Sequence, residues 1–454
     1  MTRQIRLNAF DMNCVGHIQH GLWAHPRDRS TDYTDLDHWV SLAQTLERGL
    51  FDGLFLADIL GVYDVFHDSP GASIRNAVQI PVNDPLLLIP AMAYATRHLG
   101  FGVTCNLTYE PPYTFARRMS TLDHLTKGRI GWNVVTGYLD SAARGMGMAQ
   151  QPEHDSRYDV AEEYMQVAYK LWEGSWEDSA VVRDRNARVY AEPSRVHRVQ
   201  HDGKHYKVDA IHLSEPSPQR TPVLYQAGAS DRGRAFAAEH AECIFVNGQF
   251  RHNVRDIVAD IRRQAQAFGR DPNDIKVFVG ASVVVAPTEA EAQDKLAEYR
   301  EYASSEGALA HYSASVGVDF SRYGPDEPIR FVKTNALRSN LEAITVRSGG
   351  TEWTLRKLLN MMVLGSRQAP IVGSASRVAD ELQAWVDEAD VDGFNLSRTV
   401  IPECVEDFAT LVVPELQSRG VMKSQYEQGT LRQKLFGPDS ARLPSSHPAA
   451  RYRR

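Results

Sequence analysis

A chain of 454 residues with 43% hydrophobic side chains is long enough to bury a large core, and α/β barrels with insertions reach this length as one domain. The formal net charge of −7 and a pI near 6.2 argue against a general nucleic-acid-binding protein. The four cysteines form no CxxC pair, the N-terminus lacks an apolar signal-peptide core, and no apolar run could span a membrane, so a cytoplasmic protein is expected.

Short apolar segments alternate with amphipathic segments along the chain. The predicted strands begin near residues 5, 53, 100, 129, 223, 243, 276 and 393. The predicted helices cover residues 36–50, 84–96, 113–126, 156–172, 231–238, 251–268, 289–304, 376–389 and 405–418. This alternation predicts a parallel sheet covered by helices, and eight strands favour a TIM (β/α)8 barrel over an open sheet.

Three stretches are longer than ordinary βα loops and are predicted to be insertions, at 62–83, 178–221 and 307–370. The second is expected to form small strands and the third to be helical. Residues 1–430 would then form a single barrel domain, and residues 431–454 a C-terminal tail. The end of that tail is basic and rich in proline and serine, so it is expected to be frayed.

A strand that turns through glycine into a helix is predicted at Val223–Ala238. The apolar run Val223–Tyr225 is followed by Gly228, and Ser230 or Asp231 is a suitable N-cap. A helix N-terminus presents free backbone N–H groups and the positive end of a dipole, which is a geometry that binds phosphate. An ordinary βα turn with a good cap would have the same sequence, so the other strand ends must decide between the two.

Most residues that follow the other predicted strands are polar or aromatic. They lie at 11–17, 58–63, 104–109, 133–138 and 247. In a TIM barrel these positions meet on the C-terminal face, where the chemistry takes place. They therefore predict one large pocket for a ligand that bears a phosphate. Asn133 is the most informative of them, because a polar side chain in an apolar strand must find a partner or cost about 1–3 kcal/mol.

Several longer motifs connect these elements. They include LERGLFD at 46–52, STLDHLTKGRIGWNVVT at 120–136, HDSRY at 154–158 and QAGAS at 226–230. Together they resemble the bacterial luciferase-like flavin monooxygenases, and the likeness runs from residue 7 to about residue 432. The chain is most similar to the branch that contains the nitrilotriacetate, dibenzothiophene-sulfone and dimethyl-sulfide monooxygenases, with segments 8–15 and 62–65 nearest to the last group.

The resemblance implies reduced FMN (FMNH2) as a diffusible cosubstrate, O2, and a separate NAD(P)H-dependent flavin reductase. No GxGxxG turn follows a predicted strand, which agrees with electrons arriving as reduced flavin. The expected reaction is oxygenation of a small organic molecule, such as a dialkyl sulfide or another organosulfur compound. The alternatives are a sulfone, an aminopolycarboxylate or a halogenated aromatic as substrate, or a flavin- or deazaflavin-binding protein that is no oxygenase. A homo-oligomer is expected, without nucleic-acid or membrane partners.

The resemblance also implies which residues hold FMN. The residues expected around the phosphate are Gly228, Ala229, Ser230, His154 and Tyr158. The residues expected at the isoalloxazine edge are Asp58, Thr104 and Asn133. For His154 and Tyr158 the alternative is a helix cap with a buried tyrosine, and for Asp58 it is a carboxylate that caps the following turn.

A second group of residues is expected on the substrate side. The predicted catalytic residues are Cys14, His17, Tyr63, Thr104, Asn133 and His311. The predicted wall of a dry pocket consists of Phe10, Tyr63, Tyr109 and Tyr138. For Cys14 and His17 the alternative is an ordinary loop cysteine and an exposed histidine. The histidines show no metal-ligand spacing, so no metal site is predicted.

Overall fold

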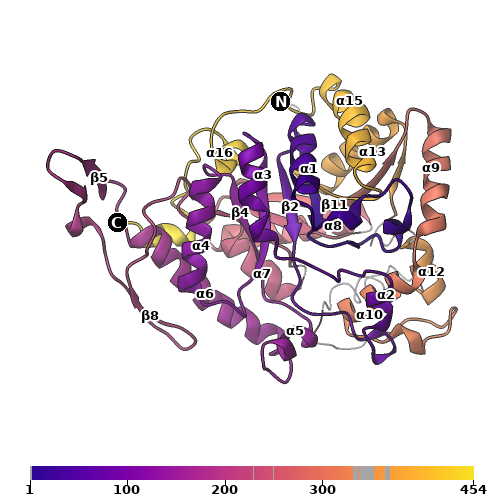
Figure 1. Cartoon of the computed structure of the whole chain (residues 1–454), viewed down its shortest axis with the longest axis horizontal. Helices are drawn as coiled ribbons and strands as arrows, with labels where there is room; N and C mark the ends of the chain where they lie inside the picture. Colours follow the sequence, from indigo (N-terminus) through magenta and orange to yellow (C-terminus); the bar gives the residue numbers. More distant parts are fainter. Residues whose placement is uncertain are drawn as a thin grey trace.

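The computed structural model describes residues 3–228, 230–248, 250–330, 336, 352–362, 364 and 369–454. Its centre is a closed ring of eight parallel strands (Figure 1). Around the ring they are β1 (Arg6–Met12), β2 (Gly53–Ala57), β3 (Gly100–Asn106), β4 (Ile130–Val135), β9 (Val223–Gln226), β10 (Cys243–Val246), β11 (Lys276–Val285) and β13 (Gly393–Ser397). Because β13 pairs with both β1 and β11, and β10 pairs with β11, the sheet closes on itself. The predicted TIM (β/α)8 barrel is confirmed.

The barrel strands are nearly continuous apolar runs because both of their faces are covered. All four residues of β9 are buried, for example. Polar side chains inside the barrel need partners from neighbouring strands. Asn8 on β1 has one, since its side-chain amide donates to the Asn395 oxygen on β13 across 2.9 Å.

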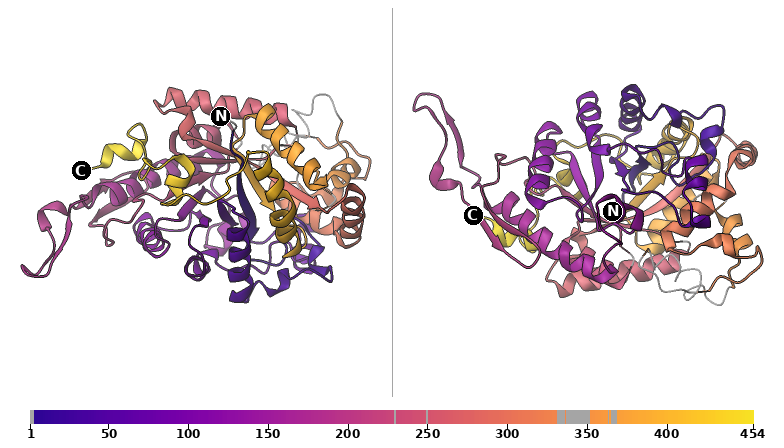
Figure 2. Two further views of the ribbon diagram at one scale, coloured as in Figure 1. Left: turned by 90° about the horizontal axis from the view of Figure 1, so that it is seen from above. Right: turned by 60° about the horizontal axis from the view of Figure 1, so that its bottom comes forward.

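Helices pack around the outside of this ring, as the two views of Figure 2 show. They include α1 (Leu36–Arg48), α3 (Ile89–Ala95), α4 (Pro112–Leu125), α6 (His154–Gly174), α7 (Asp231–His240), α8 (Arg251–Ala267), α9 (Glu289–Tyr302), α13 (Ala375–Ala389), α14 (Glu403–Asp407) and α15 (Val413–Ser418). Side-chain caps fix several of their starts. Asp35 caps α1, and Thr288 forms a capping box with Glu291 at the start of α9.

The insertions have the predicted character where they are described. The second forms two antiparallel hairpins, β5 (Val181–Asp184) with β6 (Val189–Ala191), and β7 (Val199–Asp202) with β8 (Lys207–Ala210). The first contains the short α2 (Gly71–Arg75), and the third contains α10 (Ser305–Val316) and α12 (Leu355–Met361). The strand β12 (Ile371–Gly373), which pairs with the end of β11, was not predicted. No described helix combines the length and the apolar character needed to cross a lipid bilayer.

The C-terminal segment closes the N-terminal end of the barrel. Helix α16 (Leu431–Phe436) places Leu431 and Leu435 in one buried cluster with Val223 and Cys243. Those two residues are the first of β9 and β10. Helix α16 therefore plugs the face of the barrel opposite to the predicted site.

A buried arginine fixes this plug. The Arg432 side chain is 1% exposed, and it donates to both carboxylate oxygens of Glu242 at 2.6 and 3.0 Å. It also donates to the backbone carbonyl of Thr221 at 2.8 Å. The guanidinium thus has partners that compensate for its burial.

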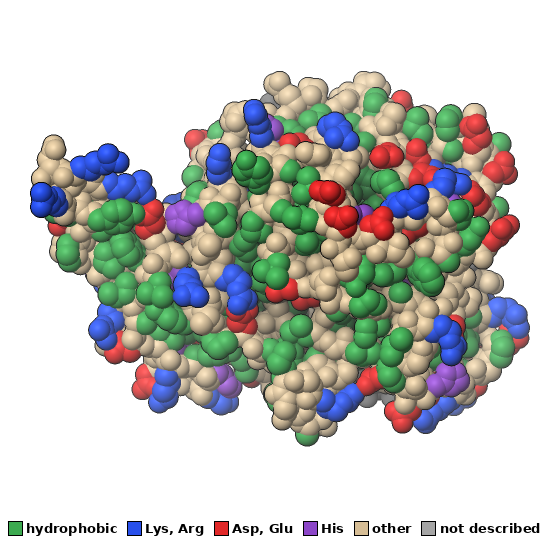
Figure 3. Space-filling model, in the orientation of Figure 1, with side chains coloured by type: hydrophobic (Ala, Val, Ile, Leu, Met, Phe, Trp, Pro, Cys, Tyr) green, Lys and Arg blue, Asp and Glu red, His purple; other side chains and the backbone are tan. Residues whose placement is uncertain are grey.

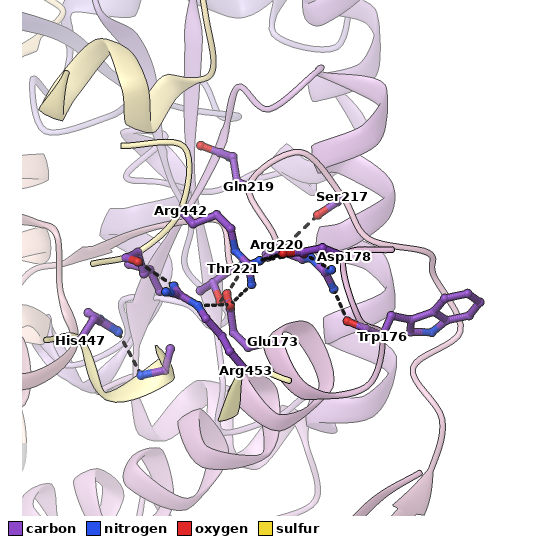
Figure 4. A network of polar contacts seen from close by, with 12 residues as sticks. Glu173, Trp176, Asp178, Ser217, Gln219, Arg220, Thr221, Arg442, His447 and Arg453 are labelled. Carbon is purple, nitrogen blue, oxygen red and sulfur yellow. Dashed lines mark hydrogen bonds and ion pairs between the residues drawn. The ribbon is translucent and has the colours of Figure 1, made fainter. Parts of the chain in front are cut away.

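The expectation of a frayed tail is wrong. Arg442 and Arg453 both donate to one carboxylate oxygen of Glu173, at 2.6 and 3.0 Å (Figure 4). His447 is buried and its Nε2 lies 2.9 Å from the carbonyl oxygen of His240. A polar, basic segment suggests fraying because its partners, above all a buried glutamate in the middle of α6, are far away in the sequence.

Candidate functional site

A cavity of about 660 Å³ lies at the C-terminal ends of the barrel strands. Its wall includes the ends of β2, β3, β4, β9 and β10 and the starts of α6 and α7. The residues predicted to hold FMN that line it are Asp58, Thr104, Asn133, His154, Tyr158, Gly228 and Ser230. Ala229, the remaining member of that group, lies outside the described residues.

The turn from β9 into α7 is packed so tightly that only glycine fits at two positions. A Cβ atom on Gly228 would lie 3.0 Å from the Cα of Gly233, and one on Gly233 would lie 2.8 Å from the Tyr158 hydroxyl oxygen. Ser230 is the N-cap of α7, and its Oγ accepts a hydrogen bond from the Gly233 N–H at 3.1 Å. We call this helix start, with Gly228, Ser230, Gly233 and Tyr158, the phosphate cradle, because backbone N–H groups and the helix dipole favour an anion here.

His154 and Tyr158 reach the phosphate cradle from α6. They lie four residues apart in the helix, and therefore on the same face, with ring centroids 5.4 Å apart. The His154 Nε2 lies 3.4 Å from the Ser230 Oγ, and its Nδ1 lies 2.7 Å from the Asp155 carboxylate. Burial raises the pKa of the Tyr158 hydroxyl, so it keeps its proton at neutral pH and can donate a hydrogen bond.

Asn133 and Thr104 form a buried polar pair at the opposite end of the lining. The Asn133 side-chain amide on β4 donates to the Thr104 hydroxyl on β3 at 2.9 Å. The Asn133 Oδ1 is buried and has no hydrogen-bond partner among the described residues, and the same holds for Gln226 Oε1 at the end of β9. Buried polar atoms without partners are rare in proteins, and both of these residues face a cavity that can supply one.

Asp58 follows β2 directly and lines the same cavity. Burial raises the pKa of its carboxyl to about 7, assisted by the charge of Asp84, while the backbone N–H of Ile59 acts in the opposite direction. A carboxyl with this pKa can gain or lose a proton near neutral pH. Such perturbed groups in a cavity are typical of functional sites.

Tyr63 and His311 lie behind the cavity wall. The Tyr63 hydroxyl lies 2.6 Å from Oε1 of Gln79 and 2.9 Å from the hydroxyl of Tyr138, and Tyr138 itself lines the cavity. The His311 ring lies 4.9 Å from the Tyr63 ring, and its Nδ1 lies 2.9 Å from Nε2 of His20. Tyr63 is thus one hydrogen bond away from the cavity, and His311 is one layer further out.

Cys14 and His17 lie on the loop after β1, outside the described cavity lining. Both are buried, which excludes the alternative of an exposed histidine. The His17 ring meets Phe10 edge-on at 4.6 Å, and Phe10 lines the cavity. Burial raises the pKa of the Cys14 thiol to about 12, so this cysteine is a thiol and a poor nucleophile at neutral pH.

The predicted aromatic wall is only partly at the cavity. Phe10 and Tyr138 line it, whereas Tyr63 and Tyr109 stand outside its described lining, and Tyr109 is hydrogen-bonded to Gln151. The third insertion contributes apolar side chains to the wall that the sequence did not single out. They are Tyr312, Leu358, Met361 and Met362.

Arg398 is a further residue that sequence reasoning missed. It follows β13, forms a buried ion pair with Asp11 at 3.0 Å, and donates to the carbonyls of Cys14 at 3.0 Å and Val15 at 2.6 Å. It thereby fixes the loop that carries His17. Its position at a strand end was the available signal, whereas nothing in the sequence marked Gln79, which reaches Tyr63 through the first insertion.

Comparison with known proteins agrees with this site. The model of the luciferase-like monooxygenase family matches residues 17–392. The chain is 52% identical over 453 residues to a long-chain alkane monooxygenase of Geobacillus thermodenitrificans, covering 100% of this chain and 99% of that one. It is 50% identical over 453 residues to a dimethyl-sulfide monooxygenase of Hyphomicrobium sulfonivorans, covering 100% and 94%.

A solved structure extends the comparison to the fold. The crystal structure of a riboflavin lyase with modified FMN superposes with a TM-score of 0.94 at 37% identity, and each chain is covered completely. The expected similarity to dimethyl-sulfide monooxygenases is confirmed, and the similarity to the alkane monooxygenase is of the same degree. The chain belongs to the luciferase-like monooxygenase family.

Proposed function

We propose that the chain is an FMNH2-dependent monooxygenase that receives reduced flavin from a separate NAD(P)H-dependent reductase. It uses O2 to oxygenate a small, neutral organic molecule. One observation carries the proposal: a single cavity connects the phosphate cradle to buried side-chain oxygens that lack described partners. The absence of a GxGxxG turn after any barrel strand supports a separate source of reduced flavin.

The residues present fit a flavin mononucleotide. Ser230 and the start of α7 would hold the phosphate, with Tyr158 as a further donor. Asn133 and Gln226 would direct their free oxygens to N–H groups of the ring system. Bound reduced FMN would supply the electrons with which O2 is split into a product oxygen atom and water.

The chain's own contribution is to orient the reactants and to keep water out. The Asn133–Thr104 pair fixes a polar edge on the barrel side of the cavity, while Phe10 and the side chains of the third insertion form an apolar wall. A wall of this kind excludes water from a reaction that water would divert to peroxide. The hydroxyl of Tyr138, held by Tyr63, places one proton at the cavity surface.

The charges around the cavity favour a neutral substrate. Three carboxyl groups line it, those of Asp58, Asp256 and Asp260. Arg234 also lines it, but it is paired with Asp260 at 2.6 Å and with Asp231 at 2.6 Å. An aminopolycarboxylate would be repelled by the acidic groups, so this alternative is disfavoured. A dialkyl sulfide satisfies the apolar wall, and so does an alkane, which the 52% identical relative makes the second candidate.

A product assay tests the proposal. The purified chain is supplied with O2, FMN, NADH and a generic flavin reductase, and it is offered dialkyl sulfides, alkanes, aryl sulfones, aminopolycarboxylates and halogenated aromatics. We expect a product that carries one oxygen atom from 18O2 with a sulfide or an alkane. Tight binding of flavin without any oxygenated product would favour the non-oxygenase alternative, and failure to bind reduced FMN would overturn the proposal.

A further inference from the structure

The hairpin of β5 and β6 projects from the barrel as a narrow extension. Figures 1 and 2 show it pointing away from the body of the molecule in every view. We call residues 181–198 the arm. Two of its large side chains, Val182 and Tyr190, are 43% and 59% exposed. The arm therefore carries apolar surface that the rest of its own chain does not cover.

The strands of the arm also have free edges. In the described part of the chain, β5 and β6 pair only with each other. A two-stranded hairpin without a packed face is marginally stable in water, and its unpaired N–H and C=O groups are a ready template for another chain. Valines and a tyrosine are typical of strands that bury at least one face. The arm is thus built as half of a contact.

The base of the arm is held rigidly. Arg220 donates to the carbonyl of Trp176 at 2.8 Å and to the carboxylate of Asp178 at 2.5 Å, as Figure 4 shows. Beyond this point His197 is paired with Glu177 at 2.8 Å. A rigid projection loses little conformational entropy when it binds a partner, which favours binding. The exposed position of the arm is therefore fixed by its own contacts.

The composition of the arm points to a protein partner of negative charge. Its cations are all arginines, with no lysine: Arg183, Arg185, Arg188, Arg195 and Arg198. Its acidic residues are Asp184 and Glu192, which gives the arm a net charge of 5 − 2 = +3. Arginine and tyrosine are enriched at protein interfaces, whereas lysine is depleted there. In Figure 3 the tip of the arm, at the far left, is dominated by basic side chains.

The rest of the chain has the complementary charge. Since the whole chain has a net charge of −7, the residues outside the arm sum to −7 − 3 = −10. Such a body attracts the arm of another copy and repels nucleic acid. We propose that the arm binds the acidic body of a second copy of this chain, so that the protein assembles through it. This inference does not depend on the proposed substrate or cofactor.

Sedimentation velocity of the full-length chain, from nanomolar to micromolar concentration, tests the arm. We expect wild type to form a dimer or a larger closed assembly that weakens as salt is added. The variant R185E/R188E changes the arm from +3 to −1 at two exposed positions. It should raise the dissociation constant at least about tenfold. The variant R117E/R300E makes the same change of charge at exposed positions on α4 and α9, and it should leave the constant within about twofold.

A second pair of variants tests the apolar part of the contact. Y190S removes the exposed ring and should weaken the assembly at low and high salt, whereas Y190F keeps the ring and should retain it. Circular dichroism and FMN binding establish that each variant is folded. A wild type that is monomeric throughout, an assembly unchanged by R185E/R188E and Y190S, or a monomer that associates only with the flavin reductase would overturn the proposal.

Discussion

The Asn133 side-chain amide donates to the hydroxyl of Thr104 across 2.9 Å, from one barrel strand to the next, and leaves the Asn133 carbonyl oxygen without a described partner. Inside the same barrel, Asn8 and Asn395 also bond each other between neighbouring strands. The difference is that Asn133 lines the large cavity, while Asn8 and Asn395 lie outside its described lining. An unpartnered oxygen that faces a cavity is a place where a ligand recovers hydrogen-bond energy.

Replacing Asn133 with leucine should separate binding from stability. Removing a buried oxygen without a partner stabilises the chain or leaves its free energy of unfolding within about 1 kcal/mol of wild type. Binding of FMN should weaken about tenfold to a hundredfold, because a hydrogen bond of about 1–3 kcal/mol is lost. Urea unfolding and flavin titration measure the two quantities. Tight flavin binding by N133L would contradict the assignment of this edge.

Thr104→Val provides the matched control on the adjacent strand. It removes the acceptor of the Asn133 amide and leaves a buried donor unsatisfied, which should lower the free energy of unfolding by about 1–3 kcal/mol. A T104V variant as stable as wild type would show that the pair does not organise the cavity.

Ser230→Asp should act on the phosphate alone. A carboxylate is a good N-cap, so α7 should keep its stability to within about 0.5 kcal/mol. Its charge repels an anion at the helix start, and FMN affinity should fall at least about a hundredfold. Riboflavin lacks the phosphate, and its affinity should change by less than about threefold. Equal loss of both affinities would place the phosphate elsewhere.

The sequence predicted the ring of strands because each barrel strand is a short apolar run between amphipathic helices. It also predicted the phosphate cradle, because a glycine turn and its N-cap are local features. Tyr63 and His311 show where such reasoning fails. Their distance from the cavity depends on how the first and third insertions fold back over the barrel, and no period or spacing encodes that path.

The C-terminal segment failed for a related reason. Its arginines are unremarkable in the sequence, and only the fold brings Arg442 and Arg453 to Glu173. A buried glutamate on the apolar side of a helix gave the complementary signal, but its partner cannot be chosen among 50 lysines and arginines without the fold.

Asp58 should make the stability of the flavin-free protein fall as pH rises. The carboxyl has an ordinary pKa of 3.8 when unfolded and about 7 when folded. Between these values the unfolded chain releases a proton that the folded chain retains, so the free energy of unfolding decreases, by at most about 4 kcal/mol. Below about pH 4 and above about pH 7 the effect is constant. Unfolding of wild type and D58N at pH 5 and pH 7.5 (about the ends of the window) measures it. Parallel pH profiles of the two proteins would refute the assignment.

Arg432→Met should destabilise the whole barrel. It leaves the carboxylate of Glu242 buried without its main partner, and breaking such a pair costs about 3–5 kcal/mol. The double variant R432M/E242L removes both charges and should recover at least about half of that loss. Thermal and urea unfolding of both variants test this. A double variant that is less stable than R432M would show that the charges themselves hold α16 at the barrel.

Tyr63→Phe should affect catalysis more than flavin binding. The variant removes the hydrogen bonds to Gln79 and to Tyr138, and so frees the Tyr138 hydroxyl at the cavity surface. Because Tyr63 stands outside the described cavity lining, the affinity for FMN should change by less than about twofold, while product formed per reduced flavin consumed should fall about tenfold. Tyr138→Phe keeps the Tyr63–Gln79 bond and removes the hydroxyl itself, so the two variants should show the same loss if the position of that proton matters. A loss in Y63F alone would instead assign the role to Tyr63 and Gln79, and to their hold on the first insertion.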